Sequence, residues 1–180
     1  MPALMIDGST RNYDRGISYE AIAEEYQDAY QNTIALVFIN GKMRELSKKA
    51  DRDGVLSFIT TRDAIGYKTY CRTAEMMLVR AVSDIAGNDV HVKIEFSVGN
   101  GYYCSVRGLD GPVDESFAGK VCDRMRALRD RRIPITKKTY PIDDAIALFE
   151  RQGMDDKVRL FHFRRCPERA DYFPAYEIMM

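Results

Sequence analysis

The sequence lacks several features that membrane, secreted and nucleic-acid-coating proteins need. Its longest apolar run, residues 34–39, is far shorter than the ~20 residues of a membrane-spanning helix. The N-terminus has no basic start followed by a long apolar stretch, so no secretory signal is indicated and the cytoplasm is the expected compartment. The 27 Lys and Arg residues equal the 27 Asp and Glu residues, which argues against a main task of coating nucleic acid or an anionic membrane.

Metal ligands are also scarce. The chain has two histidines, His91 and His162, and four cysteines, none of them in a Cys-x-x-Cys pair. A closed structural zinc site therefore has little support, and reduced thiols fit a cytosolic chain. We expect no metal and no cofactor in this chain itself.

The first 60 residues predict strands packed around one helix. Apolar stretches at 3–6, 34–39 and 54–60 are typical of strands, and Ser18 stands where an N-cap is expected before the helix. Asn40-Gly41 is a dipeptide that tolerates the two positive φ angles of a type I′ turn, so a hairpin is expected there. The expected order of strand, strand, helix, strand, short strand, strand suits a small β-grasp sheet.

Short motifs in this region, taken in order, resemble those of a TGS domain. They are Ile6-Asp7-Gly8-Ser9, Gly16-Ile17-Ser18, Ile39-Asn40-Gly41-Lys42, Glu45-Leu46 and Phe58-Ile59-Thr60. Together with Gly66 and the helix that follows, they look like the start of bacterial threonyl-tRNA synthetases. The resemblance implies a TGS-like β-grasp domain over residues 1–61.

Residues 62–180 predict a second module that mixes helices and strands. A long helix is expected to end at Gly87-Asn88, and its apolar face is expected to start at Tyr70. A hairpin is expected around Asn100-Gly101, then a helix capped by Asp114, an extended segment from residue 133 and a final short helix from Pro141. Residues 158–161 look like the last strand. The predicted fold class is therefore α+β.

This second module resembles the second additional domain of threonyl-tRNA synthetase, which in that family removes serine mischarged onto threonine tRNA. The landmarks are the long helix after Gly66, the Asn100-Gly101-Tyr102-Tyr103 hairpin, Ile133-Pro134-Ile135, Ala145-Ile146-Ala147-Leu148-Phe149-Glu150 and Lys157-Val158-Arg159-Leu160. The resemblance covers roughly residues 62–176.

The polar editing residues of that family are replaced in this chain. The resemblance places the two helical histidines at Arg72 and Met76, the cysteine at Tyr176 and the last histidine at about Met180. An arginine stays protonated and a thioether cannot transfer a proton near neutral pH. We therefore expect no hydrolysis of aminoacyl-tRNA. Arg72, Met76, Tyr103 and Tyr176 remain candidates for a degenerate cleft that holds a small-molecule ligand.

Two of these candidates also have simpler interpretations. Arg72 could reach a phosphate or carboxylate, but a solvated arginine on a helix surface is favoured. Tyr102 and Tyr103 could stack on a base. Because adjacent strand residues point to opposite faces, core packing of one of them is favoured.

Two further groups are open to both a functional and a structural interpretation. His162 and Cys166 could form a nucleophile pair, although a surface histidine and a half-buried thiol are favoured. A basic run could follow an RNA backbone, yet a solvated helix face is favoured because the net charge is zero. The run consists of Arg124, Arg126, Arg129, Arg131, Arg132, Lys137 and Lys138.

The two modules together look like the N-terminal half of bacterial uridine kinase-like nucleoside kinases of the phosphoribulokinase and uridine kinase type. The resemblance implies a following kinase domain that would bind ATP and Mg²⁺. No Gly-x-x-x-x-Gly-Lys-[Ser/Thr] motif occurs in the chain, so this region itself should be inactive. We expect an accessory region that regulates the kinase or recruits its ligand. The alternatives are an RNA- or tRNA-binding module and an editing hydrolase with altered residues.

Overall fold

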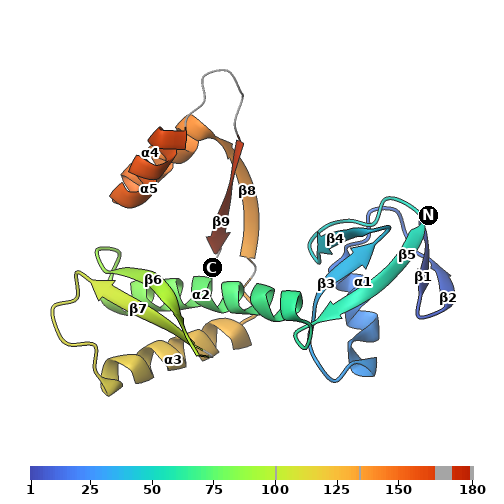
Figure 1. Cartoon of the computed structure of the whole chain (residues 1–180), viewed down its shortest axis with the longest axis horizontal. Helices are drawn as coiled ribbons and strands as arrows, with labels where there is room; N and C mark the ends of the chain where they lie inside the picture. Colours follow the sequence, from blue (N-terminus) through green and yellow to red (C-terminus); the bar gives the residue numbers. More distant parts are fainter. Residues whose placement is uncertain (100, 134, 165–171, 179–180) are drawn as a thin grey trace. The chain divides into compact units, whose positions relative to one another are not determined.

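The computed structural model describes residues 1–99, 101–133, 135–164 and 172–178 (Figure 1). The chain divides into two compact units, Met1–Ala74 and Glu75–Met180. This division falls inside a helix that both units share, whereas the resemblance placed a domain boundary between residues 61 and 62. That boundary stays a prediction.

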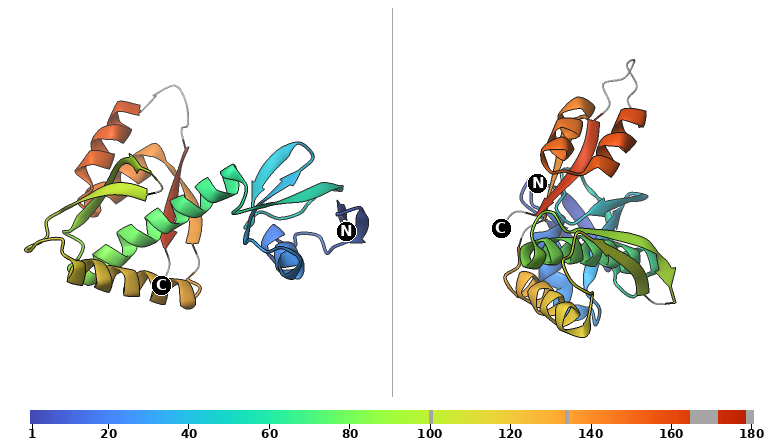
Figure 2. Two further views of the ribbon diagram at one scale, coloured as in Figure 1. Left: turned by 60° about the horizontal axis from the view of Figure 1, so that its bottom comes forward. Right: turned by 90° about the vertical axis from the view of Figure 1, so that its left-hand side faces the viewer.

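The first unit is built on a five-stranded sheet. Its strands are β1 (Ala3–Ile6), β2 (Ser9–Asn12), β3 (Ile34–Ile39), β4 (Lys42–Glu45) and β5 (Gly54–Thr60). They lie in the order β2-β1-β5-β3-β4, with β1 and β5 parallel and the other pairs antiparallel. Helix α1 (Tyr19–Tyr26), followed by the 3-10 turn η1 (Gln27–Ala29), lies along one side of the sheet (Figure 2). This is the β-grasp order that the sequence predicts.

Local signals fix both the helix and the hairpin of this unit. The Ser18 side chain accepts a hydrogen bond from Ala21 N at 3.1 Å and so caps α1. Asn40 and Gly41 adopt φ angles of 48° and 77°, as a type I′ turn between β3 and β4 requires. Both predictions are confirmed.

The core of the first unit lies between α1 and the sheet. Leu4, Ile6, Ile22, Val37 and Leu56 are at most 1% exposed. Burying each of these side chains stabilises the fold by roughly 1.5–3 kcal/mol. The alternating apolar residues of β1, β3 and β5 therefore supply most of this core.

The second unit begins within helix α2 (Ala64–Ala86) and contains that helix from Glu75 onward. Strands β6 (His91–Val98) and β7 (Gly101–Arg107) and helix α3 (Glu115–Asp130) follow. Gly87, with a φ of 94°, ends α2, and Asp114 caps α3 by accepting a hydrogen bond from Phe117 N at 2.8 Å. β6 and β7 form the predicted antiparallel hairpin. The buried core residues here are Ala81, Val82, Val90, Val121 and Leu128.

One end of the predicted α2 stripe is wrong. Met77, Leu78 and Ile85 pack on the core as the spacing predicts, but Tyr70 is 57% exposed. The apolar residues of α2 that pack on this cluster begin at the half-buried Met77, and Tyr70 lies about two turns before it. Helical spacing alone therefore does not mark where the covered stripe starts.

The rest of the second unit pairs a helical hairpin with a two-stranded sheet. Strands β8 (Ile135–Pro141) and β9 (Tyr172–Ile178) are antiparallel, and helices α4 (Ile142–Arg151) and α5 (Asp155–Arg164) lie between them in the sequence (Figure 1). Gly153, with a φ of 68°, follows α4 as predicted. The α+β class is confirmed for the chain.

The predicted last strand at 158–161 is wrong, because these residues lie in α5. Asp155 and Asp156 occupy the first turn of α5, where carboxylates favour the helix dipole. Val158 and Phe161, three residues apart, both pack against the α4 cluster. The apolar spacing is therefore helical, and the helix that begins after Pro141 is not the final one.

Candidate functional site

The predicted site residues depend on where α2 begins. Asp63 Oδ2 accepts hydrogen bonds from Thr60 N at 2.8 Å and from Thr60 Oγ1 at 3.1 Å, which closes the turn before the helix. The first turn of α2 then passes so close to β5 that a Cβ on Gly66 would collide with the Thr60 carbonyl oxygen. Glycine at this position therefore lets α2 start where it does.

Arg72 and Met76 lie one turn apart on α2. Arg72 is exposed and Met76 is half-buried. Neither side chain can take or give a proton near neutral pH. The structure thus places on this helix the two residues that the resemblance aligns with the editing histidines, and neither can act as a general base. Their membership of a ligand cleft stays a prediction.

The sequence analysis does not identify an interaction between a thiol on β7, Cys104, and a carboxylate on α2, Glu75. Burial raises the pKa of the Cys104 thiol above its ordinary value, and the negative charge of Glu75 raises it further. Strand alternation gives the signal: Cys104 on β7 shares a face with Val106, which packs on the α2 core. With a raised pKa, Cys104 is protonated near neutral pH and is not an activated nucleophile.

On the first turns of α2, Tyr67 and Cys71 interact one turn apart. A hydrogen bond with Cys71 raises the pKa of the Tyr67 hydroxyl above its ordinary value, and the charge of Cys71 adds to this effect. Because Tyr67 is 49% exposed to solvent, this contact is a local feature of the helix surface.

The clearest aromatic feature lies on the hairpin. The rings of Phe96 and Tyr103 stack with centroids 5.1 Å apart and planes 21° from parallel. They are 59% and 55% exposed, and Tyr102 is 46% exposed. The prediction that one of the two tyrosines is core is therefore wrong. Val92 and Val106 pack on the core cluster that α2 and α3 share with the hairpin. Phe96, Tyr102 and Tyr103, which lie nearer the hairpin turn, are not part of that cluster.

Polar residues continue the same hairpin face. Tyr103, Ser105 and Arg107 alternate along β7 and so point to one side. Glu95 accepts hydrogen bonds there from Lys93 Nζ at 2.6 Å and from Ser105 Oγ at 2.8 Å. The hydrogen bond with Lys93, followed by that with Ser105, lowers the pKa of Glu95 below its ordinary value. We call this set, with the aromatic pair, the hairpin face.

Tyr176 lies in β9, where the strand register pairs it with Lys137 of β8. Its side chain lies outside the described part of the structure, as do Met180 and Cys166. His162 lies in α5 and is exposed. The suggested Cys166–His162 pair therefore lies partly outside the described residues and stays a prediction.

Acidic neighbours neutralise part of the basic run. Arg124 contacts Asp84 on α2, with an Nη2–Oδ2 distance of 2.6 Å, and Arg80 Nε contacts the other carboxylate oxygen at 2.8 Å. Within α3, Arg126 pairs with Asp123 and Arg129 with Asp130, both at 2.8 Å. Three of the arginines thus form ion pairs within the second unit, which agrees with the favoured interpretation of a solvated helix face.

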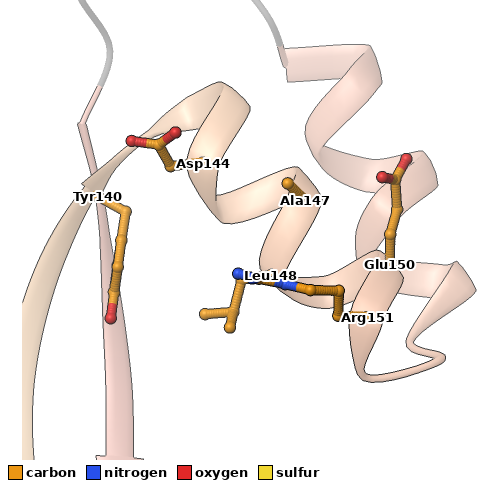
Figure 3. Close-up of a pocket in the computed structure, with 6 residues that line it drawn as sticks. All are labelled: Tyr140, Asp144, Ala147, Leu148, Glu150 and Arg151. Carbon is orange, nitrogen blue, oxygen red and sulfur yellow. The ribbon is translucent and has the colours of Figure 1, made fainter.

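A hollow of about 720 Å³ lies where β8 meets α4 (Figure 3). The side chains of Tyr140 and Leu148 point into the same space, and Asp144 and Arg151 stand beside them. Within the described part of the chain, the residues that line this hollow come from α4 and the end of β8. Of the predicted cleft residues whose side chains the structure describes, none lines it.

No group of three His, Cys, Asp or Glu side chains in the described ranges could hold a metal ion. Across the same ranges, no helix has the length and apolar character that would let it cross a membrane.

Most of the chain is similar to threonine–tRNA ligases. It is 29% identical to the threonine–tRNA ligase of Rhodospirillum rubrum over 154 residues, which cover 86% of this chain and 24% of that protein. It is 29% identical to that of Syntrophotalea carbinolica over 92% of this chain and 26% of the relative, and 26% identical to that of Acetivibrio thermocellus over 90% and 25%. The chain spans about a quarter of the length of these relatives. No protein-family model matches it.

These similarities support a threonyl-tRNA synthetase-like region, as the motifs of both modules predict. The prediction of a uridine kinase-like or nucleoside kinase parent is wrong, because the relatives are consistently named threonine–tRNA ligase. The kinase interpretation rested on the combination of the two modules with replaced editing positions. The similarity to threonine–tRNA ligases covers both modules, so their combination does not require a kinase.

Proposed function

We propose that this chain is a tRNA-binding region, similar to part of threonyl-tRNA synthetase, that does not hydrolyse aminoacyl-tRNA. The observation that carries the proposal is the similarity to threonine–tRNA ligases over 81–92% of the chain. The loss of editing chemistry is supported by Arg72 and Met76, which stand where the resemblance places the helical histidines.

The hairpin face is the proposed RNA contact. Unpaired bases stack on exposed aromatic rings, and each such stack is worth roughly 1–3 kcal/mol. Phe96 and Tyr103 present a flat, pre-stacked pair that is more than half exposed. Arg107 lies on the same face, where its guanidinium can donate hydrogen bonds to a phosphate.

Charge contributes less than base stacking to the proposed affinity for tRNA. Lys93 is held by Glu95 at 2.6 Å, and three arginines of the basic run pair with aspartates. Few phosphates are therefore neutralised, so the affinity should fall only gently as salt rises. A base-stacking contact, in contrast, does not depend on counterion release.

The proposal is tested by titrating the full chain into deacylated tRNA labelled with a fluorophore and following anisotropy. The double variant Phe96→Ala/Tyr103→Ala should bind at least about tenfold more weakly than the unmodified chain. Tyr70→Ala is the matched control, because it removes an equally exposed tyrosine from α2 and should leave the affinity unchanged. Circular dichroism should show that both variants stay folded. Loss of affinity in Tyr70→Ala alone, or no binding by the unmodified chain at low salt, would contradict the proposal.

A further inference from the structure

A second hollow, of about 420 Å³, lies within the first unit, and none of its lining residues is among those proposed to contact tRNA. Its walls come from the N-terminus of α1, the β3–β4 hairpin and the segment that follows β4. Five cationic side chains line it, and we call it the basic hollow. They are Lys42, Arg44, Lys48, Lys49 and Arg52.

The charge of the basic hollow is not that of the unit around it. The first unit carries ten Lys and Arg residues and ten Asp and Glu residues, so it is neutral as a whole. Half of those cations line the hollow, and Asp51 is the one carboxylate among its lining residues in the described part of the chain. Like charges that gather in this way repel one another and destabilise a fold unless an anion offsets them.

Hydrogen bonds hold the frame of the basic hollow in place. Tyr19 N donates to Lys48 O at 2.9 Å, and Ala50 N donates to Ile17 O at 2.8 Å, which ties the 46–50 segment to the start of α1. In the β3–β4 hairpin, the Asn40 side chain donates a hydrogen bond to Asp53 O at 3.0 Å. The backbone that presents the cations is therefore ordered before any ligand arrives.

Tyr19, the aromatic residue that lines the basic hollow, has a pKa that responds to the charges around it. Tyr19 is 4% exposed, and burial raises the pKa of its hydroxyl above the ordinary value, with a further rise from Asp51 and an opposing effect from Arg44. Asp51 is in turn offset by Arg52, with an Nε–Oδ2 distance of 3.6 Å. The lining of the hollow thus combines two buried residues, Tyr19 and Ile39, with the five cationic side chains.

We propose that the basic hollow binds a small anion with closely spaced phosphates, of the nucleoside polyphosphate class. The lining residues carry a net of four positive charges, which matches the about four negative charges of a triphosphate chain near neutral pH. A volume of 420 Å³ lies within the range of small-ligand sites, roughly 300–1,000 Å³. Lysine and arginine side chains are the common donors to such phosphates.

The test uses isothermal titration calorimetry on the full chain, with inorganic triphosphate as the probe and AMP as the single-phosphate comparison. Triphosphate should bind saturably and at least about tenfold more tightly than AMP. The variants Arg44→Gln/Lys48→Gln and Lys42→Gln should each weaken triphosphate binding, the double variant by at least about tenfold. Lys68→Gln, which removes an exposed charge from α2, should bind as the unmodified chain does.

Three outcomes would overturn the proposal. They are the absence of saturable triphosphate binding at millimolar concentration, an equal loss in Lys68→Gln, and displacement of triphosphate by a decamer of oligo(U) that binds more tightly. The last result would make the hollow an RNA-backbone site. The Phe96→Ala/Tyr103→Ala variant should bind triphosphate normally, so failure of this proposal and failure of the tRNA proposal are separable.

Discussion

Gly66 decides whether α2 can follow β5 directly. A methyl group there would collide with the Thr60 carbonyl oxygen, which is backbone and cannot rotate away. Gly66→Ala should therefore destabilise the chain by at least about 2 kcal/mol, measured by urea unfolding followed by circular dichroism. Gly119→Ala is the control, since nothing lies within 4 Å of its added Cβ in α3. It should stabilise the chain by up to about 1 kcal/mol, and equal destabilisation by both changes would contradict the account.

Cys104 provides a prediction about pH. Burial and the Glu75 carboxylate both raise the pKa of its thiol, so the reactive thiolate forms only at higher pH than for an ordinary cysteine. Glu75→Gln removes one of the two causes and should shift the alkylation of Cys104 by iodoacetamide to lower pH. Peptide mass spectrometry would follow Cys104, with the exposed Cys122 as an internal reference. A Cys104 profile unchanged by Glu75→Gln, or one shifted to higher pH, would show that the two groups do not interact.

Helix α5 takes the place of a predicted strand, and its packing can be tested. Phe161 is 7% exposed and its ring lies 5.1 Å from that of Phe149 on α4. Phe161→Ala should cost about 3–5 kcal/mol, or less if the site collapses, in the unfolding free energy of this part of the chain. Phe163, which is 90% exposed, gives the control. Phe163→Ala should change the unfolding free energy by less than about 0.5 kcal/mol. On a strand, 161 and 163 would share one face, so equal effects would contradict the helix.

The first unit could be predicted element by element because its signals are local. Ser18 caps the helix it precedes, Asn40 and Gly41 form the turn that their tolerance of positive φ favours, and the alternating apolar runs pair as strands. The second unit was harder to predict at residues 158–161. Val158 and Phe161 fit helix spacing as well as a short strand run, and only the partner helix α4 decides between them.

The candidate site was harder to predict than the fold. Strand alternation correctly implies that Tyr102 and Tyr103 point to opposite sides, but it does not say how far the helices extend along the hairpin. Both tyrosines are exposed because that cover ends first. The Glu75–Cys104 interaction joins residues from α2 and β7, so no sequence motif contains it. The basic hollow likewise gathers cations from a strand and from the segment that follows it.

For the molecule as a whole, two surfaces with different chemistry follow from the structure. The hairpin face of the second unit offers stacked rings beside a largely neutralised set of charges, whereas the basic hollow of the first unit offers concentrated positive charge. The relatives are threonine–tRNA ligases, of which this chain matches about a quarter. A tRNA-binding region without editing chemistry accounts for the similarity and for the replaced histidine positions together.

The most direct test incubates the full chain with threonine tRNA that carries radiolabelled serine and measures both filter-retained tRNA and released serine. The account predicts retention of the labelled tRNA together with serine release no faster than in buffer, because neither Arg72 nor Met76 can transfer a proton near neutral pH. Serine release well above the buffer rate, or the absence of retained tRNA, would contradict it.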